Sequence, residues 1–349
     1  MTATGSASPD RIAIEHKVAF LSDPRSHPHA PATVEVIETS MSWVFLAGPR
    51  VFKLKKPILR DFLDFSTLDK RESAVREETR LNRRLAGDVY GAPRALRLRR
   101  DGGLSLAGDG EIVDWLVDMR RLPESSTLES RIGARTLRPT DVSSVVVLMA
   151  RFYGALPPAE LAPDDYVRQF AGELGKTRAV LNDPALGLDD PGLMPALDGF
   201  ESHFEAVSPL LKDRVRAGRV VEGHGDLRPQ HVFLTEPPAI IDCLEFSLRL
   251  RLIDPFDEIA FLGMECAQLG APWIIDVLAA DLAAALGEQV PPPLLGFYWR
   301  YRALLRARLA LLHLAVPAPR TPAKWRPLAR QYLALSQDSR FSLRPPAGR

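Results

Sequence analysis

Two aspartates at the ends of apolar segments are the residues whose types and spacing could do chemistry. Asp226 follows His224 and Gly225 in "VVEGHGDLRPQHVFL", and Asp242 follows two isoleucines in "AIIDCLEF". A carboxylate is costly to bury without a partner, so we expect both side chains to face a polar site. One could act as a general base or orient a hydroxyl, and the other could hold a hard cation. Taken alone, either aspartate could instead be a turn residue or a strand-end cap.

A second group of charged residues lies earlier in the chain. Lys53 and Lys55 alternate along the otherwise apolar segment "RVFKLKKP", so they share one face of the predicted strand. Glu77 and Glu78 follow in a helical segment. A strand lysine held by a helix glutamate is the arrangement with which kinase-type enzymes orient nucleotide phosphates. The same glutamates could equally belong to a solvated, charged helix face.

The elements that position these residues can be predicted from local pattern. The β-rich runs "WVFLA" and "RVFKLKK" predict a hairpin that turns at Gly48 and Pro49. A helix is expected over 66–87, with Ser66 as its N-cap, Asp69 at the capping-box spacing and Gly87 as its stop. Short alternating strands then follow around an Asp-Gly-Gly turn.

Helical periodicity dominates after Pro123, and strand character returns only in the segments that carry the two aspartates. We therefore expect a disordered N-terminus over 1–14, a sheet-rich lobe over 15–122, a mostly helical lobe over 123–338 and a flexible tail over 339–349. The predicted helices of the second lobe cover residues 139–155, 163–180, 194–217, 255–268, 273–287, 293–316 and 322–337.

Composition excludes several classes of function. The 45 Lys and Arg residues balance 44 Asp and Glu residues, which gives no basic field for nucleic acid. Cys243 and Cys266 cannot build a disulfide framework, so a reducing cytoplasm is the expected location. The first ten residues lack the pattern of a signal peptide, and charges such as Asp276 and Asp281 interrupt the most apolar stretches. No membrane partner is expected.

Together, "HGDLRPQHVFL", "IIDCLEF" and "RLIDPFDEIAFL" resemble the catalytic core of the aminoglycoside phosphotransferase (choline kinase-like) family, within the protein-kinase-like superfamily. The segment from "ETSMSWVFLAGPRVFKLKKP" to "NRRLA" resembles a bacterial subfamily that is often fused to a P-loop kinase domain. Because no GxxxxGK[ST] motif occurs here, we expect the stand-alone form. The resemblance implies an α+β, protein-kinase-like fold with a small β-rich N-lobe that binds nucleotide. The larger helical C-lobe would carry the catalytic loop and the acceptor site.

The resemblance also implies roles for residues of the motifs "HGDLRPQHVFL", "IIDCLEF" and "RLIDPFDEIAFL". Asp226 matches the catalytic aspartate on the acceptor hydroxyl, and Asp242 matches the aspartate that holds Mg²⁺ against the ATP phosphates. Asp257 matches the aspartate that braces the catalytic loop. Arg228 stands where His or Lys is common and still supplies a cation for the transferring phosphate. His231 occupies the position of the family's metal-binding asparagine, although Mg²⁺ prefers oxygen to imidazole nitrogen.

On the nucleotide side, Lys53 best matches the phosphate-orienting lysine, and Lys55 is the second choice. Glu78 fits the paired helix glutamate better than Glu77. The segment "VDMRRLP" falls where the interlobe hinge belongs, which places Met119 near the adenine. The loop "ETSMS" departs from the family because it lacks the glycines of a flexible phosphate-binding loop.

The sequence therefore predicts an ATP- and Mg²⁺-dependent phosphotransferase that acts on a hydroxyl of a small molecule such as a sugar, aminoglycoside or amino alcohol. Two alternatives stay open. His231 and the glycine-poor loop would suit a pseudokinase that binds nucleotide and acts by interaction. His224, Asp226 and His231 could also be a ligand set of a metal-dependent hydrolase. The acceptor, the choice between ATP and GTP and the oligomeric state stay open.

Overall fold

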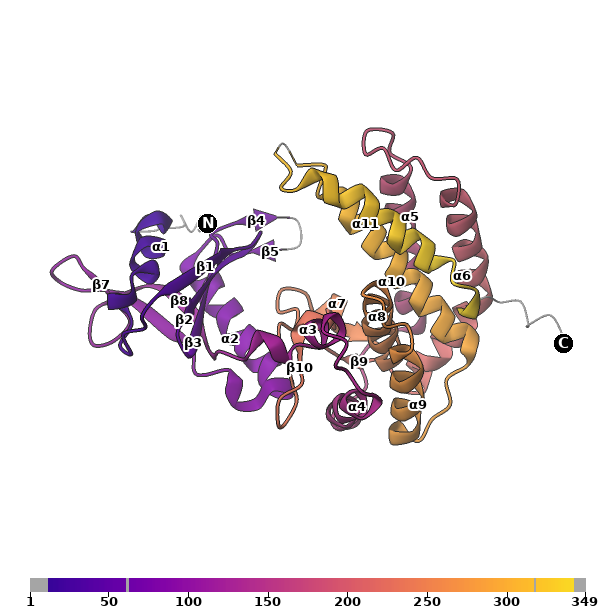
Figure 1. Ribbon diagram of the computed structural model, residues 1–349, viewed down its shortest axis with the longest axis horizontal. Helices are drawn as coiled ribbons and strands as arrows, with labels where there is room; N and C mark the ends of the chain where they lie inside the picture. Colours follow the sequence, from indigo (N-terminus) through magenta and orange to yellow (C-terminus); the bar gives the residue numbers. More distant parts are fainter. Residues whose placement is uncertain (1–11, 61–62, 317, 342–349) are drawn as a thin grey trace, which may run out of the picture. The chain divides into compact units, whose positions relative to one another are not determined.

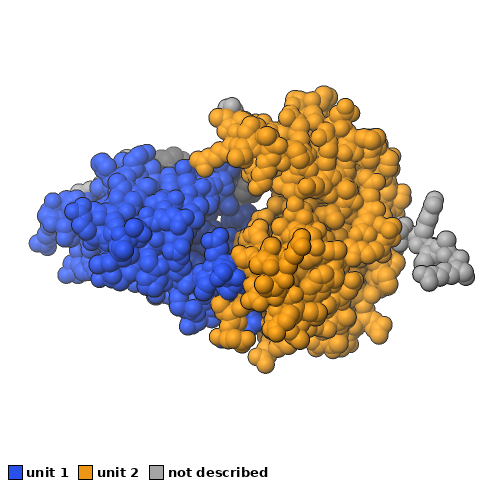
Figure 2. Space-filling model, in the orientation of Figure 1, with its two compact units in different colours: residues 1–126, 237–249 blue, residues 127–236, 250–349 orange. Residues whose placement is uncertain are grey.

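The computed structural model describes residues 12–60, 63–316 and 318–341, and these form two compact units (Figure 2). The first unit comprises Met1–Ser126 and Pro237–Arg249, and the second comprises Thr127–Glu236 and Leu250–Arg349. Within the predicted disordered termini, helix α1 begins at Ile14 and a 3₁₀ turn covers Ser339–Phe341. The rest of both predicted segments, 1–11 and 342–349, lies outside the described residues.

A six-stranded antiparallel sheet forms the framework of the first unit (Figure 1). The predicted hairpin is confirmed, and Gly48 at its turn takes a φ of +58°, which glycine adopts at little cost. In spatial order the strands are β1 (Val34–Glu38), β2 (Ser42–Ala47), β3 (Arg50–Lys55), β8 (Glu111–Arg120), β6 (Arg94–Leu98) and β7 (Leu104–Ser105). A separate two-stranded pair joins β4 (Leu59–Arg60) to β5 (Leu63–Asp64).

Helix α1 (Ile14–Ser22) was not predicted. Its Leu21 joins the apolar core that Phe45, Phe52 and Leu54 of the sheet help to form. The helix also buries Lys17, whose Nζ lies 2.7 Å from Asp114 Oδ2. A buried lysine in a nine-residue helix weakens the amphipathic signal, which explains why periodicity did not reveal this element.

Helix α2 (Leu68–Ala86) supplies the glutamate of the predicted ion pair. Its N-cap is Thr67, whose hydroxyl accepts from the backbone N–H of Lys70, so the prediction that Ser66 caps the helix was wrong by one residue. The Ser66 hydroxyl donates instead to Asp64. Gly87 ends the helix as predicted, with a φ of +49°.

Helices build the second unit, and α8 is its most buried helix, with neighbours α9, α10 and α11 (Figure 1). The predicted helices are confirmed to within a residue or two, except that α10 ends at Leu312 rather than at 316. The helices are α3 (Leu128–Gly133), α4 (Pro139–Gly154), α5 (Pro163–Leu181), α6 (Leu193–Arg216), α8 (Pro255–Gln268), α9 (Ile274–Leu286), α10 (Pro292–Leu312) and α11 (Pro322–Ser336).

Short strands carry the two aspartate motifs. In the second unit, β9 (Val221–Glu222) pairs antiparallel with β12 (Leu252–Ile253), and β10 covers Val232–Phe233. In the first unit, β11 covers Ala239–Ile240, and the four-residue helix α7 begins at Leu248 and ends at Arg251 in the second unit. None of the helices in the described parts of the chain has both the length and the apolar character that a bilayer crossing requires.

Candidate phosphotransfer site

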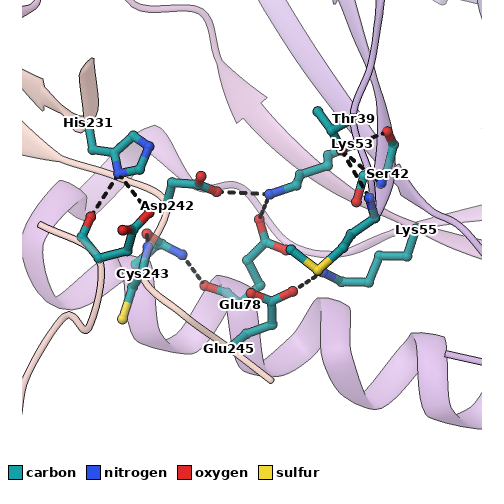
Figure 3. Close-up of polar contacts among 12 residues, drawn as sticks. Thr39, Ser42, Lys53, Lys55, Glu78, His231, Asp242, Cys243 and Glu245 are labelled. Carbon is teal, nitrogen blue, oxygen red and sulfur yellow. Dashed lines mark hydrogen bonds and ion pairs between the residues drawn. The ribbon is translucent and has the colours of Figure 1, made fainter. Parts of the chain in front are cut away.

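The carboxylate of Glu78 binds both candidate lysines of β3 (Figure 3). Lys53 Nζ lies 3.0 Å from Glu78 Oε1, and Lys55 Nζ lies 2.6 Å from Oε2. Glu77, one position earlier, faces outward and binds Arg80. The strand alternation and the helix register thus bring together the predicted lysine and the preferred glutamate.

Each lysine has a second carboxylate partner from the segment after β11. Lys53 Nζ lies 2.9 Å from Asp242 Oδ1, and Lys55 Nζ lies 2.5 Å from Glu245 Oε1 (Figure 3). Sequence reasoning missed Glu245. The signal available was its position three residues after Asp242 in a segment that already carried one functional carboxylate.

The backbone around Asp242 is held in an uncommon conformation. Asp242 has a φ of +65°, a left-handed geometry that aspartate tolerates better than most residues. Its N–H lies 3.3 Å from the hydroxyl of Tyr90, and the next N–H, of Cys243, donates to Asn82 Oδ1 at 2.9 Å. Because the surroundings fix this turn, the Asp242 side chain, which is 45% exposed, is aimed from a defined position.

Mutual attraction keeps this cluster charged. Burial works to lower the pKa of Lys53, but the charges of Asp242 and Glu78 outweigh it and raise that pKa well above its usual value. Burial likewise works to raise the pKa of Glu78, and the two lysines reverse the effect, so the Glu78 pKa is lowered. At neutral pH the cluster therefore contains ammonium groups and carboxylates rather than neutral pairs.

Met119 lies on β8 directly opposite Val51 of β3, two residues from Lys53. Since alternate residues of a strand face the same side, Val51, Lys53 and Met119 share one face of the sheet.

The loop between β1 and β2 turns without glycine. Thr39 ties it instead, because its Oγ1 accepts from the Ser42 N–H at 2.9 Å (Figure 3).

In the second unit, the loop that carries Asp226 is held from α8 by Glu258. The backbone N–H groups of His224 and Gly225 both donate to the Glu258 carboxylate, and the Tyr153 hydroxyl donates to it at 2.6 Å. Gly225, with a φ of +87°, provides the turn.

The expectation that Asp257 braces this loop was wrong by one residue. Both Asp257 oxygens accept from Arg302 of α10, at 2.7 and 2.8 Å. A helix turns by about 100° per residue, so adjacent side chains cannot face the same neighbour, and here Glu258 faces the loop.

His231 and Asp226 meet through the loop backbone. His231 Nδ1 lies 2.9 Å from the Asp226 carbonyl oxygen and 3.8 Å from its Oδ2. Nδ1 is therefore the protonated nitrogen, since only a donor can bind a carbonyl. Arg228, two residues after Asp226, lies 3.6 Å through its Nε from Glu265 Oε2. Asp226, Arg228 and His231 belong to the second unit, whereas Lys53, Lys55, Glu78, Met119 and Asp242 belong to the first.

The oxygen chemistry of Asp242 suits Mg²⁺, which accepts one or two carboxylates and fills its other positions with phosphate oxygens and water. His231 suits it less, because Mg²⁺ prefers oxygen ligands to an imidazole nitrogen. No group of three or more His, Cys, Asp or Glu side chains is arranged to hold a metal ion within 12–60, 63–316 and 318–341. His224, Asp226 and His231 thus do not form the ligand set that the hydrolase alternative requires.

Sequence comparison finds relatives of this chain but no matching family model. Uncharacterized proteins of Mycobacterium bovis and Mycobacterium tuberculosis are 30% identical to it over 298 residues, which is 83% of this chain and 57% of each relative. The chain thus spans about half the length of the curated relatives it matches.

Among solved structures, the GDP complex of aminoglycoside 2'-phosphotransferase-IIIa is similar with a TM-score of 0.54 and 15% identity, covering 92% of this chain and 97% of that one. A choline/ethanolamine kinase family protein from Mesorhizobium loti gives a TM-score of 0.48 at 15% identity, over 92% and 99% of the two chains. The first similarity confirms the predicted α+β, protein-kinase-like fold with a β-sheet N-lobe and a helical C-lobe.

Proposed function

We propose that this protein transfers the γ-phosphate of ATP to a hydroxyl of a small molecule. The observation that carries the proposal is the chain of contacts from Glu78 through Lys53 to Asp242, at 3.0 and 2.9 Å. Phosphoryl transfer depends mostly on positioning and charge neutralisation, and a lysine fixed between a helix glutamate and a metal-binding aspartate serves both needs. The shared fold with a GDP-binding phosphotransferase adds support.

On the nucleotide side, Lys53 would exchange part of its contact with Asp242 for phosphate oxygens, while Glu78 keeps the lysine in place. Asp242 would hold Mg²⁺, which neutralises charge on the phosphates. The backbone near Met119 would contact the base. Because the sequence has only two cysteines and both are buried, the chain suits the reducing cytoplasm, where we propose that it acts.

On the acceptor side, Asp226 would accept or orient the proton of the acceptor hydroxyl, and Arg228 would stabilise charge on the transferring phosphoryl group. Asp226 is partly exposed, and the Glu258 contacts fix the backbone from which it projects. A positioned base contributes roughly 10²–10⁴-fold to such a step.

The test compares wild type with Asp226→Asn and Asp242→Asn, which change charge but little volume. Nucleotide affinity is measured by calorimetry with and without Mg²⁺, and turnover is measured as ADP release with a panel of hydroxylated compounds. We expect Asp226→Asn to lose turnover and keep its affinity within a few-fold. Asp242→Asn should lose both turnover and the Mg²⁺ dependence of binding. Near wild-type turnover of Asp226→Asn would refute the assignment.

The pseudokinase alternative draws on two observations, the glycine-free loop tied by Thr39 and the engagement of His231 Nδ1 by a backbone carbonyl. It predicts a different pattern in the same experiment. Nucleotide would bind without Mg²⁺ dependence, and neither wild type nor the variants would release ADP with any acceptor.

A further inference from the structure

Two arginines of the second unit converge on one carboxylate close to the catalytic loop. Glu265 of α8 receives Arg306 of α10 at 2.8 Å, and Arg228 of the loop approaches its other oxygen at 3.6 Å. The Arg228 and Arg306 side chains are 22% and 18% exposed, while Glu265 is nearly buried. The single carboxylate neutralises one of the two cations, so the second guanidinium is left to interact with Asp226 and with a bound ligand.

The stretch of chain that contains Arg306 adds no carboxylate. Residues 289–337, which include α10 and α11, contain seven arginines and one lysine but no Asp or Glu. Two other arginines of α10 bind other carboxylates, because Arg302 binds Asp257 and Arg308 binds Glu173. Arg306 differs from them in sharing its carboxylate with a residue of the catalytic loop.

The guanidinium of Arg306 stays charged in this setting. Burial is the largest single effect and works to lower its pKa, but the charge of Glu265, the interactions with Tyr332 and the charge of Asp226 together raise the pKa above its usual value. The contribution of Asp226 places Arg306 within electrostatic range of the carboxylate assigned to the acceptor hydroxyl.

Uncharged hydrogen-bonding groups adjoin the cluster. The Tyr332 hydroxyl lies 3.5 Å from an Arg306 nitrogen, and one turn beyond Glu265 the amide of Gln268 binds that of Gln331 at 3.1 Å. A phenol and two amides bind hydroxyl groups well. A guanidinium that Glu265 does not neutralise, with neutral polar neighbours, favours a hydroxylated ligand with negative charge.

We propose that the phosphate acceptor is a hydroxylated anion, bearing a carboxylate or a phosphate ester, and that Arg306 binds this group beside Arg228, the cation assigned to the transferring phosphoryl group. The inference rests on the proposed function, since it takes Asp226 as the residue on the acceptor hydroxyl. Arginine binds both kinds of anion through paired N–H donors. A cationic amino sugar or amino alcohol would instead meet like charge, which counts against the amine-bearing acceptors.

The first experiment measures acceptor-stimulated ADP release with matched sets of compounds, in which one polyol skeleton carries a carboxylate, a phosphate ester, no charge or an amine. Glucuronate, glucose 6-phosphate, glucose and glucosamine form one such set. We expect stimulation from members of the carboxylate or the phosphate ester arm, and the stronger arm identifies the anion. Preference for the neutral or amine arm overturns the inference. So does basal ATP hydrolysis that no anionic member accelerates, whereas no ATP turnover at all refutes the proposed function instead.

The second experiment separates acceptor from donor. Arg306→Gln should raise the KM of the anionic acceptor by roughly ten-fold or more, as expected for loss of a charge-assisted hydrogen bond, and leave the KM of ATP nearly unchanged. Arg306→Lys should restore part of the acceptor affinity. Arg330→Gln is the matched control, because Arg330 of α11 is paired with Asp190 at 3.8 Å and should leave both KM values unchanged.

A double variant guards against a folding defect, since Arg306→Gln alone takes from Glu265 its nearer cation and leaves it the more distant Arg228. The variant that combines Arg306→Gln with Glu265→Gln removes one cation and its carboxylate together. Arg228 is then the cation that Glu265 no longer neutralises. The acceptor KM of the double variant should then lie between those of wild type and Arg306→Gln. An equal rise in the KM of ATP and of the acceptor in Arg306→Gln would assign the cation to the donor phosphates and overturn the inference.

Discussion

Lys53 and Lys55 bind the two oxygens of one carboxylate, that of Glu78, from positions two residues apart on β3. They differ in accessibility, because the Lys53 side chain is 18% exposed and that of Lys55 only 1%. Lys53 can therefore reach a ligand, whereas Lys55 is enclosed by Glu78 and Glu245. The first lysine suits a binding role and the second a role in holding the site together.

Substituting each lysine by methionine should give two distinct defects. Lys53→Met should weaken productive ATP binding by roughly ten-fold or more and change the unfolding midpoint little. Lys55→Met leaves Glu78 and Glu245 as buried carboxylates with one cation fewer, which should cost about 3–5 kcal/mol of stability. Denaturant unfolding and ATP titration of both variants check this. Comparable losses of ATP binding in the two folded variants would contradict the division of roles.

His231→Asn should preserve or raise Mg²⁺-dependent turnover. An asparagine amide can donate to the Asp226 carbonyl as His231 Nδ1 does at 2.9 Å, and it adds an oxygen that Mg²⁺ prefers. His231→Leu, which removes the donor, should lower turnover because the loop loses this contact. Turnover of the two variants across a Mg²⁺ titration is the measurement. A fall in both would show that the imidazole itself is required.

Glu258→Gln and Asp257→Asn are a matched pair of adjacent, charge-removing substitutions. Glu258 accepts from the backbone of the Asp226 loop, and charge-assisted bonds contribute about 1.5–3 kcal/mol, so Glu258→Gln should lower kcat by about ten-fold. Asp257→Asn instead leaves Arg302 buried without its counter-charge and should mainly lower the free energy of unfolding. Kinetics and denaturant titrations of both distinguish the roles, and a larger kcat loss in Asp257→Asn would reverse them.

His203 should make stability depend on pH in mildly acidic solution. Burial lowers its pKa from 6.5 to about 4, although the hydrogen bond from Nε2 to the Pro293 carbonyl works to raise it, and the buried Nδ1 has no partner within the described residues. The unfolded chain thus binds more protons between these values, so this contribution is complete above pH 6.5 and declines as pH falls toward 4. At pH 5.5 the loss should be on the order of 1 kcal/mol. His203→Gln should show a smaller decline from pH 7.5 to 5.5 in urea unfolding, and an identical decline would exclude His203 as its source.

Much of the fold could be predicted because local signals agreed with the final structure. The β2–β3 hairpin has a two-residue turn with glycine, and the long helices of the second unit have clear apolar periodicity. Helix α1 was not predicted because Lys17 has the pattern of an exposed polar residue. Its burial can be expected only if its partner Asp114, far along the chain, is known. A charge that is satisfied by a distant partner cannot be recognised from its own neighbourhood.

In the candidate site, too, some residues could be predicted from local sequence and others depended on distant partners. The motif spacing selected Lys53, Glu78 and Asp242, which the fold of the first unit joins by direct contacts. The loop-bracing role was assigned to Asp257, whereas Glu258 fills it in the structure, because two adjacent acids in a helix differ only in the direction they face. Glu245 was missed because its significance depends on Lys55, which sequence treated as an alternative to Lys53 rather than as its complement.

The membership of Pro237–Arg249 in the first unit has a consequence for biosynthesis. A ribosome delivers residues up to Ser126 early, but Asp242 and Glu245 emerge only after the first half of the helical unit has been made. Until then the nascent sheet holds Lys53 and Lys55 with Glu78 alone, one carboxylate for two ammonium groups. The N-terminal part of the first unit therefore stays incomplete until a short segment that is translated much later joins it. Its folding can finish only when synthesis has passed that segment.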